Sequence, residues 1–411
     1  MENKIINGTS WLLSSFFLLT LLLRLFNIID IDLHLTQIMS VAFLFAGLCC
    51  VRKIKVHGFD SLVLLYLFYM ILNGLLIDYH HHWKFLYRAL LAHVFPVMCY
   101  FIARYTQIDI GNYLTKMKWP ILFAMTCGIA FYFLHPSWYV AMKESQIKEY
   151  ATEMSISGVY RLSSFWGHPY VLGYATFLYC VIVTYKLLLG LKNRKELMFY
   201  LFTAFVCIVV LLLAQLRVTI VVYALSIIYM ILSCKQESLS RKMWKILELA
   251  LCLILFAFIF LQFASESMDY ISSHMLNLTE DNSMSDRFEH TAGGVNFFSL
   301  FGDGLGRYGY PARDYGMWAI VDHEFQCHVA ELGYFGVSLL CCIILLTTLK
   351  CFKRLHLVVE NSILFFFFMA MLGASVLSNS HQYNYIFWYT LGLVWSANYK
   401  KRGVKINKQA V

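Results

Sequence analysis

Charged residues are scarce in this sequence. Only 14% of its 411 residues are Asp, Glu, Lys or Arg, whereas 60% are apolar and 17% are aromatic. A water-soluble globule could not bury this much hydrocarbon surface, so the composition indicates an integral membrane protein. The sequence also lacks internal repeats, low-complexity segments and any polar linker long enough to separate folding units. We therefore expect a single membrane domain over residues 1–411.

The 12 cysteines include no C-x-x-C pair, which argues against a redox or metal motif. Nearly all of them lie in or beside apolar runs, as is typical of small membrane-core residues, and only Cys327 approaches the polar side described below. The net charge of +9 comes from Lys and Arg scattered in short loops. Membrane topology explains this pattern better than nucleic-acid binding does.

Long apolar runs predict an all-α polytopic fold. A helix that crosses a hydrocarbon core of about 30 Å needs roughly 20 apolar residues, and the sequence offers about 12 candidates. Gln215 and Arg217 interrupt the apolar stretch near 197–234, which predicts a helical hairpin with Arg217 at its tip. The expected spans are 11–30, 35–51, 59–77, 85–104, 119–136, 169–187, 197–214, 218–234, 246–264, 327–349, 361–378 and 383–398.

The positions of Lys and Arg predict the orientation, because short basic loops stay cytoplasmic. Placing the N-terminus inside assigns most of the 33 Lys and Arg residues to the cytoplasm, together with both termini. The two larger loops, about 137–168 and 265–326, then lie outside, where functional residues are expected. In the second loop, Ser285 as a cap and Gly302 as a stop predict an interfacial helix.

Arginine dominates the basic residues that this topology leaves for the membrane and the outer side. Its guanidinium group stays charged and binds phosphate oxygens in a bidentate manner, which favours an anionic ligand, although each arginine could instead reach lipid headgroups. Arg217 is distinctive because apolar residues flank it on both sides. The set is Arg24, Lys84, Arg88, Lys143, Lys148, Arg161, Arg217, Arg287, Arg307 and Arg313.

Two further segments carry candidate functional residues. Arg161 and His168 precede the helix predicted from Pro169, whose N-terminal N–H groups suit an anion, although His168 could equally be an interfacial histidine bonded to backbone. Further on, a glycine-rich turn from Gly302 to Arg307 precedes Asp322-His323-Glu324. A carboxylate beside His323 can orient its imidazole, which makes His323 a candidate general base.

No metal site is expected in this segment. His323-Glu324 resembles the start of the zinc-protease pattern H-E-x-x-H, but His328 follows one residue later than that pattern requires. The glycine-rich turn is not followed by Lys-Ser/Thr, so it is not a nucleotide P-loop.

Over about residues 155–340, the order of these segments resembles the bacterial O-antigen polymerase and O-antigen ligase superfamily of the Wzy and WaaL type. The sequence departs from the family pattern at Tyr170, Gln215 and Glu324, and these departures weaken a ligase assignment most. The resemblance is carried by Arg161 to Gly173, Gln215-Leu-Arg217, Ser285-Asp-Arg287, Gly302-Asp-Gly304-Leu-Gly306, and His323-Glu324 leading to Glu331-Leu-Gly333-Tyr-Phe-Gly336.

The resemblance implies a polymerase that joins polyprenyl-diphosphate-linked oligosaccharides at the periplasmic face of the bacterial inner membrane. Arginines would stabilise the leaving diphosphate and a histidine would take the acceptor proton, with inversion and without metal or cofactor. Besides the glycan substrate and the bilayer, a chain-length regulator protein is a candidate partner, and nucleic acid is not. The implied residues are catalytic His323, Glu324 and Asp322; diphosphate-binding Arg161, Arg217 and Arg287; and glycan-contacting His168, Gly304, Arg307 and Arg313.

Three alternatives stay open. A ligase would transfer the lipid-linked glycan to the lipid A-core. A transporter or flippase would need inverted repeats and charges buried in the membrane, for which Arg24 and Arg88 are the best candidates. An intramembrane metalloprotease would depend on the incomplete H-E-x-x-H spacing.

Overall fold

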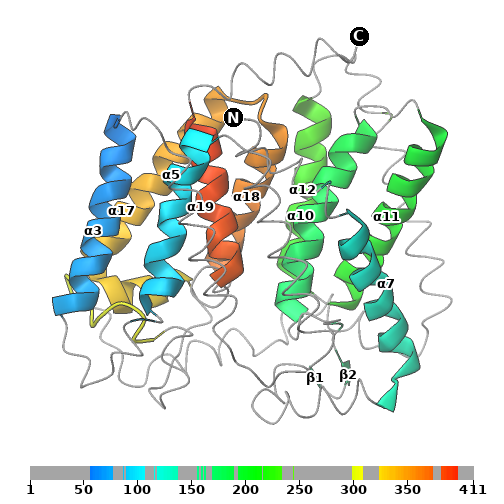
Figure 1. The fold of residues 1–411 in the computed structure, drawn as a ribbon, viewed down its shortest axis with the longest axis horizontal. Helices are drawn as coiled ribbons and strands as arrows, with labels where there is room; N and C mark the ends of the chain where they lie inside the picture. The colour runs from blue at the N-terminus through cyan, green and yellow to red at the C-terminus, as the bar shows by residue number, and fades with distance from the viewer. Residues whose placement is uncertain are drawn as a thin grey trace, which may run out of the picture. The chain divides into compact units, whose positions relative to one another are not determined.

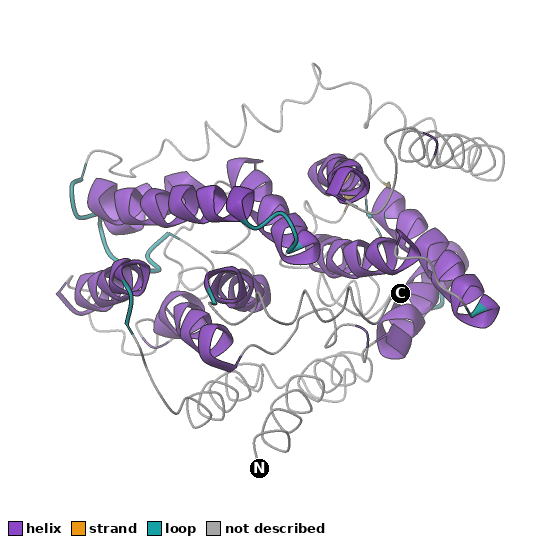
Figure 2. Ribbon diagram, turned by 90° about the horizontal axis from the view of Figure 1, so that it is seen from above, coloured by secondary structure: helices purple, strands orange, loops and turns teal. Residues whose placement is uncertain are grey.

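The described part of the chain is almost entirely helical (Figure 2). It falls into two compact units, which we call unit 1 and unit 2 (Figure 1). The single domain expected over residues 1–411 stays a prediction. The computed structural model describes residues 56–76, 87, 89–106, 115, 118–137, 155–156, 159–160, 162, 169–188, 193–214, 216–233, 244, 299–308, 324–373 and 381–396.

Long helices occupy most of the predicted spans that fall within the described residues. Unit 1 contains α3 (Gly58–Leu76), η1 (Leu90–Val94), α5 (Phe95–Thr106), α17 (Glu324–Lys353), α18 (Val358–Gly373) and α19 (His381–Trp395). Unit 2 contains α7 (Lys118–Leu134), β1 (Ser155–Ile156), β2 (Val159–Tyr160), α10 (Pro169–Leu188), α11 (Arg194–Leu213) and α12 (Arg217–Ser233). The spans predicted at 11–30, 35–51 and 246–264 lie outside the described residues.

Three of these helices are long and apolar enough to cross a membrane: Gly58–Leu75, Arg194–Leu213 and Glu324–Lys353. Shorter apolar helices accompany them. Large apolar side chains such as Phe68 and Leu345 are about 60% exposed, as expected where a helix faces lipid. These features agree with the membrane class predicted from composition, whereas the number of spans and their orientation stay predictions.

Three local features refine the prediction. The helical break near Arg217 is confirmed, because α11 ends at Leu213 and α12 begins at Arg217. The all-helical class is confirmed for the described residues, and a two-residue antiparallel pairing of Ser155–Ile156 with Val159–Tyr160 accompanies the helices. Residues 299–308 are not helical, and the rest of the helix expected to stop at Gly302 lies outside the described residues.

Within unit 1, close approach of α5 and α19 forms the centre of the packing. Gly392 of α19 has no side chain, and a Cβ there would meet the Tyr100 carbonyl and the Ala103 side chain. Phe59 of α3 stacks on Trp395 of α19 with ring centroids 3.7 Å apart. Gly392 therefore allows a closeness that any larger residue would prevent.

Two opposite ends of unit 1 can be distinguished from its contacts. The start of α3 meets the ends of α5 and α19, where Arg104 lies 3.0 Å from Asp60 and donates to the Trp395 carbonyl. The starts of α5 and α19 meet at the other end, where the Asn384 amide donates to the Ala92 carbonyl. α3 therefore runs opposite to α5 and α19, which run parallel to each other.

α17 is broken near its start. Gly333 has φ 66° and ψ −176°, so α17 consists of two helical segments, one on each side of this residue. A left-handed φ is readily adopted by glycine and rarely by other residues. The break interrupts the backbone ladder within the span predicted at 327–349, and its free groups need other partners.

Unit 2 is organised around α10, which packs against both α11 and α12. Thr184 of α10 and Tyr223 of α12 share a hydrogen bond of 2.7 Å, and both side chains are buried. α7 lies along α11, where Trp119 contacts Phe199 with ring centroids 4.8 Å apart. Gly173 of α10 contacts Leu216, just before α12, so the start of α10 meets the turn that precedes Arg217.

Candidate functional site

The structure describes some of the predicted functional residues. Glu324 begins α17, Gly304 and Arg307 lie in the loop 299–308, and the backbone of Arg217 begins α12. The other predicted site residues lie outside the described residues, and their roles stay predictions. They are Asp322, His323, Arg161, Arg287, His168 and Arg313.

The loop 299–308 replaces the backbone bonds that α17 loses at its break. In a continuous helix, the N–H groups of Tyr334 and Phe335 would bond to the carbonyls of residues 330 and 331. They bond instead to the carbonyls of Ser299 (3.3 Å) and Leu300 (3.1 Å). The carbonyls of Ala330 and Glu331 accept instead from Asp303 (2.8 Å) and Gly304 (3.0 Å). The loop and the broken helix are therefore one interlocked structure.

Two glycines make this contact possible. Gly302 has φ 78°, and a Cβ on it would collide with the backbone of Glu331 and Gly333. A Cβ on Gly333 would in turn collide with the backbone of Leu300 and Gly302. At Gly302, the close neighbour of the glycine-rich turn is therefore α17 of the same chain.

Side chains of α3 hold the same loop from another direction. Tyr69 donates to the carbonyls of Leu332 (2.6 Å) and Phe301 (3.0 Å), and Asn73 donates to the Phe301 carbonyl at 2.7 Å. A Cβ on Gly336 would lie 2.8 Å from the Tyr69 ring, so glycine makes room for that ring. Gly333 thus breaks the helix, and Gly336 leaves room for Tyr69, whose hydroxyl binds the carbonyls of Leu332 beside the break and Phe301 of the loop.

Glu331 ties the loop to the interior of unit 1. Its side chain is buried, and its Oε1 accepts from the Tyr308 N–H at 3.0 Å. Its Oε2 lies 4.0 Å from His93 Nε2, while its backbone carbonyl accepts from Gly304. The Tyr308 hydroxyl donates to Asp303 Oδ2 at 2.6 Å, and burial together with this bond raises the pKa of Tyr308 to about 12.

Glu324, a predicted catalytic residue, is fully buried in the described structure. Its Oε1 lies 3.2 Å from Nδ1 of His328, which is one helical turn further along α17. His328 Nδ1 is also 2.9 Å from the Glu324 carbonyl. Glu324 therefore directs its carboxylate toward His328, and its assistance to His323 stays a prediction.

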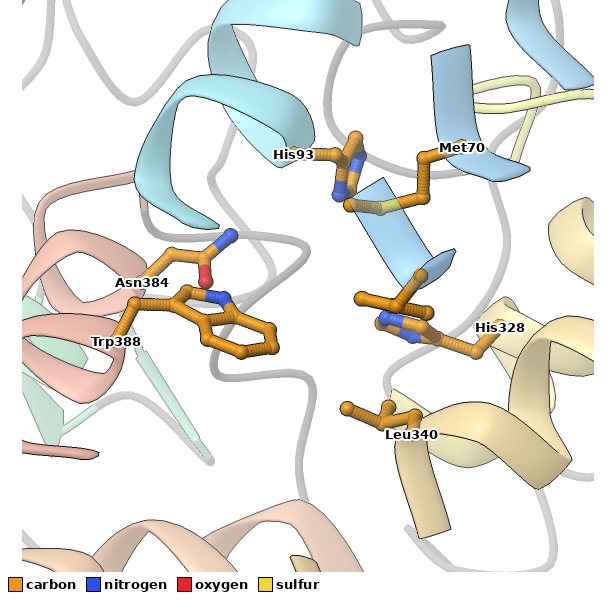
Figure 3. A pocket seen from close by; sticks show the side chains of 7 residues that line it. Met70, His93, His328, Leu340, Asn384 and Trp388 are labelled. Carbon is orange, nitrogen blue, oxygen red and sulfur yellow. The ribbon is translucent and has the colours of Figure 1, made fainter. Parts of the chain in front are cut away.

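A small cavity separates the two histidines from α19 (Figure 3). About 10 Å³ is open to the centre of a water-sized molecule, which is roughly the space that one buried water needs. The rings of His93 and His328 are nearly perpendicular, with centroids 6.4 Å apart. Asn384 Oδ1 is buried there without a hydrogen-bond partner in the described part of the chain. The lining residues are Tyr66, Met70, His93, His328, Leu340, Asn384 and Trp388.

His93 lies in an unusual turn. Residues Leu90–Val94 form a π-helical turn, a form that is rare and frequent at functional sites. α19 supplies hydrogen bonds to its carbonyls: Tyr385 donates to Leu91 (3.3 Å) and Asn384 to Ala92 (2.9 Å). The contacts fix the turn that presents His93 to the cavity. No group of three or more His, Cys, Asp or Glu side chains among the described residues is placed to hold a metal ion.

In unit 2, the neighbours of two predicted anion-binding arginines come together. Leu162, which follows Arg161 in the sequence, donates its N–H to the Leu213 carbonyl at 3.1 Å. Leu213 ends α11, and Arg217 begins α12 after the short turn. Gly173, near the start of α10, contacts Leu216 in that same turn. Leu162 and the start of α10 therefore both lie at the junction of α11 and α12, and the roles of the two arginines stay predictions.

Four residues at this position in unit 1 were not predicted as functional from sequence. No role was assigned to His93, Glu331 or Asn384, and His328 was considered only for zinc binding. A signal was present for α17: Glu324, His328 and Glu331 are spaced by four and three residues, which places them on one helical face. Arg24 and Arg88, the residues named as candidates for buried charge, lie outside the described residues. Described charges buried in unit 1 are Asp60, Arg104, Glu324, Glu331 and Glu360.

Comparison of the chain with protein-family models, with characterised proteins and with solved structures finds no match.

Proposed function

We propose that this protein is a membrane glycosyltransferase that polymerises polyprenyl-diphosphate-linked oligosaccharides, as an O-antigen or capsular polysaccharide polymerase. The observation that carries the proposal is the interlocking of the glycine-rich turn with α17. These are two of the separate sequence segments that resemble the polymerase and ligase superfamily, and Asp303 and Gly304 of one bond to Ala330 and Glu331 of the other. Their contact supports the proposal that both segments contribute to one site.

The proposed reaction places a general base beside this structure. Asp322 and His323 lie in the chain between loop 299–308 and α17. The residues that flank this chain contact α17 side chains: the Tyr308 N–H donates to Glu331, and Glu324 contacts His328. His323 would take the acceptor hydroxyl proton as that oxygen forms a bond to the anomeric carbon. The carbon–oxygen bond to the diphosphate would break, with the electron pair leaving on the diphosphate, which arginine would stabilise.

The distribution of charge in unit 1 supports an external site. Arg104, Lys350, Lys353 and Arg354 gather at the end opposite to loop 299–308, and basic residues accumulate at the cytoplasmic side of membrane proteins. Loop 299–308 would then face the periplasm of a bacterial inner-membrane protein.

The first test is glycan display in the host cell after gene deletion. The deleted strain is complemented with wild type, Arg217→Ala or His323→Ala, and each protein is checked for membrane abundance. We expect deletion and both substitutions to leave single repeat units on the lipopolysaccharide, with Lys195→Ala as an exposed control that restores polymer. Polymer held on the lipid carrier would indicate a ligase, and unchanged glycan would exclude both activities.

A specific observation favours one other class of protein, a transporter or flippase for lipid-linked glycans. The buried cluster of His93, Glu324, His328 and Glu331 beside a broken helix has the ingredients of proton-coupled transport sites. In that case, deletion would abolish all glycan addition rather than its polymerisation, and purified protein in liposomes would move lipid-linked oligosaccharide between leaflets.

A further inference from the structure

We infer that Glu331 is a positioning residue whose ionised carboxylate, facing His93, holds loop 299–308 on the break in α17. The inference rests on the proposed function in so far as the chain that follows this loop carries the predicted base His323. It concerns how that segment is held, and it assigns no contact with substrate to Glu331.

Glu331 binds the loop at two places. Its backbone carbonyl accepts from Gly304 because the break at Gly333 frees it, and its carboxylate accepts from the Tyr308 N–H. These bonds lie at the middle and at the end of the described loop. A single residue of α17 therefore fixes the course of the chain from Gly304 to Tyr308.

The hydrogen bond from the Tyr308 N–H is strong only when the Glu331 carboxylate is ionised. A hydrogen bond from a backbone N–H to an ionised carboxylate is roughly twice as strong as one to a neutral acceptor. The Glu331 side chain is only 1% exposed, so the charge is removed from water and needs compensation. His93 Nε2 lies 4.0 Å from the carboxylate and can supply a cation there, in the π-helical turn that α19 holds in place.

Titratable groups from several elements of unit 1 lie around this carboxylate. The described groups are Glu324 and His328 of α17, Tyr66 of α3, His93 of η1 and Tyr308 of the loop, and Asp303 and Arg307 act in turn on Tyr308. Glu324 lies 3.2 Å from His328, whereas Glu331 lies 4.0 Å from His93 and also accepts from the Tyr308 N–H of the loop. Protonation of Glu331 at low pH would weaken the loop contact while the other bonds of α17 remain.

The test measures release of the loop directly, without substrate. Leu305 lies in the loop and is fully buried, so a cysteine at this position reacts with a water-soluble maleimide only when the loop leaves α17. In purified Leu305→Cys protein, we expect Glu331→Gln to raise the labelling rate about tenfold and His93→Gln to raise it less. Because His93 acts through Glu331, the double variant should behave like Glu331→Gln alone. The same variants without Leu305→Cys supply the background from native cysteines.

Two controls separate positioning from general destabilisation. Glu360 of α18 is a second buried carboxylate of unit 1, and Glu360→Gln should leave the labelling rate unchanged. Lowering the pH should raise the rate in the Glu331 protein, relative to the Glu331→Gln protein as a reference that retains every other titratable group. Glu331→Asp, which keeps the charge, should restore part of the protection.

The inference is overturned if Glu331→Gln labels at the parental rate, or if Glu360→Gln raises the rate equally. If Glu331→Gln cannot be purified in folded form, the His93→Gln variant and the pH profile of the Leu305→Cys protein decide the question instead. The outcome is independent of the polymerase proposal: glycan that is unchanged by gene deletion would remove the proposed function, while a labelling rate that depends on Glu331 would still stand.

Discussion

The two ends of unit 1 bury charge in different ways. At one end, the Asp60 carboxylate accepts from Tyr100 (2.6 Å) and from the His57 N–H (2.8 Å) and lies 3.0 Å from Arg104. At the other, Glu331 faces His93 at a looser 4.0 Å. The Asp60 carboxylate is thus fixed by a close cation and two hydrogen bonds, whereas the approach of Glu331 to His93 is longer by about 1 Å. The first arrangement is suited to holding helices together, and the second to a contact that can be broken and remade.

The bonding partners reinforce this contrast. Arg104 and Arg354 donate to the carbonyls at the end of α19, of Trp395, Val394 and Ser396, where cations complement the helix dipole. Arg104 lies in α5 and Arg354 directly follows α17, so these bonds tie the ends of helices together. Glu331 instead joins a helix to a loop, and the neighbouring histidines line a cavity. The comparison indicates that the Arg104 end determines stability and that the Glu331 end determines the position of the loop.

The largest expected effect is on the Arg104 end. Arg104→Gln would leave the buried Asp60 carboxylate without its cation, and the loss of one partner of a buried pair typically costs about 3–5 kcal/mol. We expect the free energy of unfolding to fall by that amount, measured by denaturation in detergent. Lys195→Gln, at an exposed position, should change it by less than about 0.5 kcal/mol. Unfolding of Arg104→Gln at the wild-type midpoint would contradict the fastening role.

Gly333→Ala should have the next largest effect, because it acts on the break in α17. Alanine would have to adopt φ 66° and would meet the Leu300 backbone, so the loop bonds to α17 would be lost. Strain of this kind costs roughly 1–3 kcal/mol, to which the lost hydrogen bonds add. The thermal unfolding midpoint and the reactivity of Leu305→Cys would show the change. Gly58→Ala, where a Cβ meets nothing within 4 Å, is the matched control and should unfold like wild type.

The smallest expected effect is at Tyr308. Tyr308→Phe removes the hydroxyl bond to Asp303 and should lower the free energy of unfolding by roughly 1 kcal/mol at neutral pH. Because the folded protein raises the pKa of Tyr308 to about 12, its protonated phenol is favoured in the folded state. That stability is present below pH 10 and is lost between pH 10 and 12. Wild type should therefore lose stability more steeply than the Phe variant across this window, and parallel curves would contradict the assignment.

Much of the helical framework could be predicted from sequence. The span predicted at 59–77 is α3, Gly58–Leu76, and the one predicted at 197–214 is α11, Arg194–Leu213. Both are nearly continuous apolar runs, so length and composition suffice to find them. The break at Gly333 was missed, because the same apolar composition describes a straight helix and a broken one, and only the loop that replaces the lost bonds reveals the difference.

The candidate site was less accessible from sequence. Glu324 was selected for its place beside His323, but its described contact is with His328, four residues away. Glu331 and Gly333 were noted as part of a resemblance without a role, and their roles depend on Tyr308 and Leu300 in a distant segment. His93 stood alone in an apolar run, and a single sequence offers no reason to connect it with Glu331.

The sequence by itself determined that the chain carries long apolar helices, where several of them begin and end, and that Arg217 follows a break between two of them. These properties follow from local composition, because each helix satisfies its own backbone bonds. Only the tertiary structure decided that loop 299–308 completes the broken α17, and that Glu331 faces His93. Those contacts join residues separated by tens to hundreds of positions, and their energy depends on burial and geometry that arise when the helices pack.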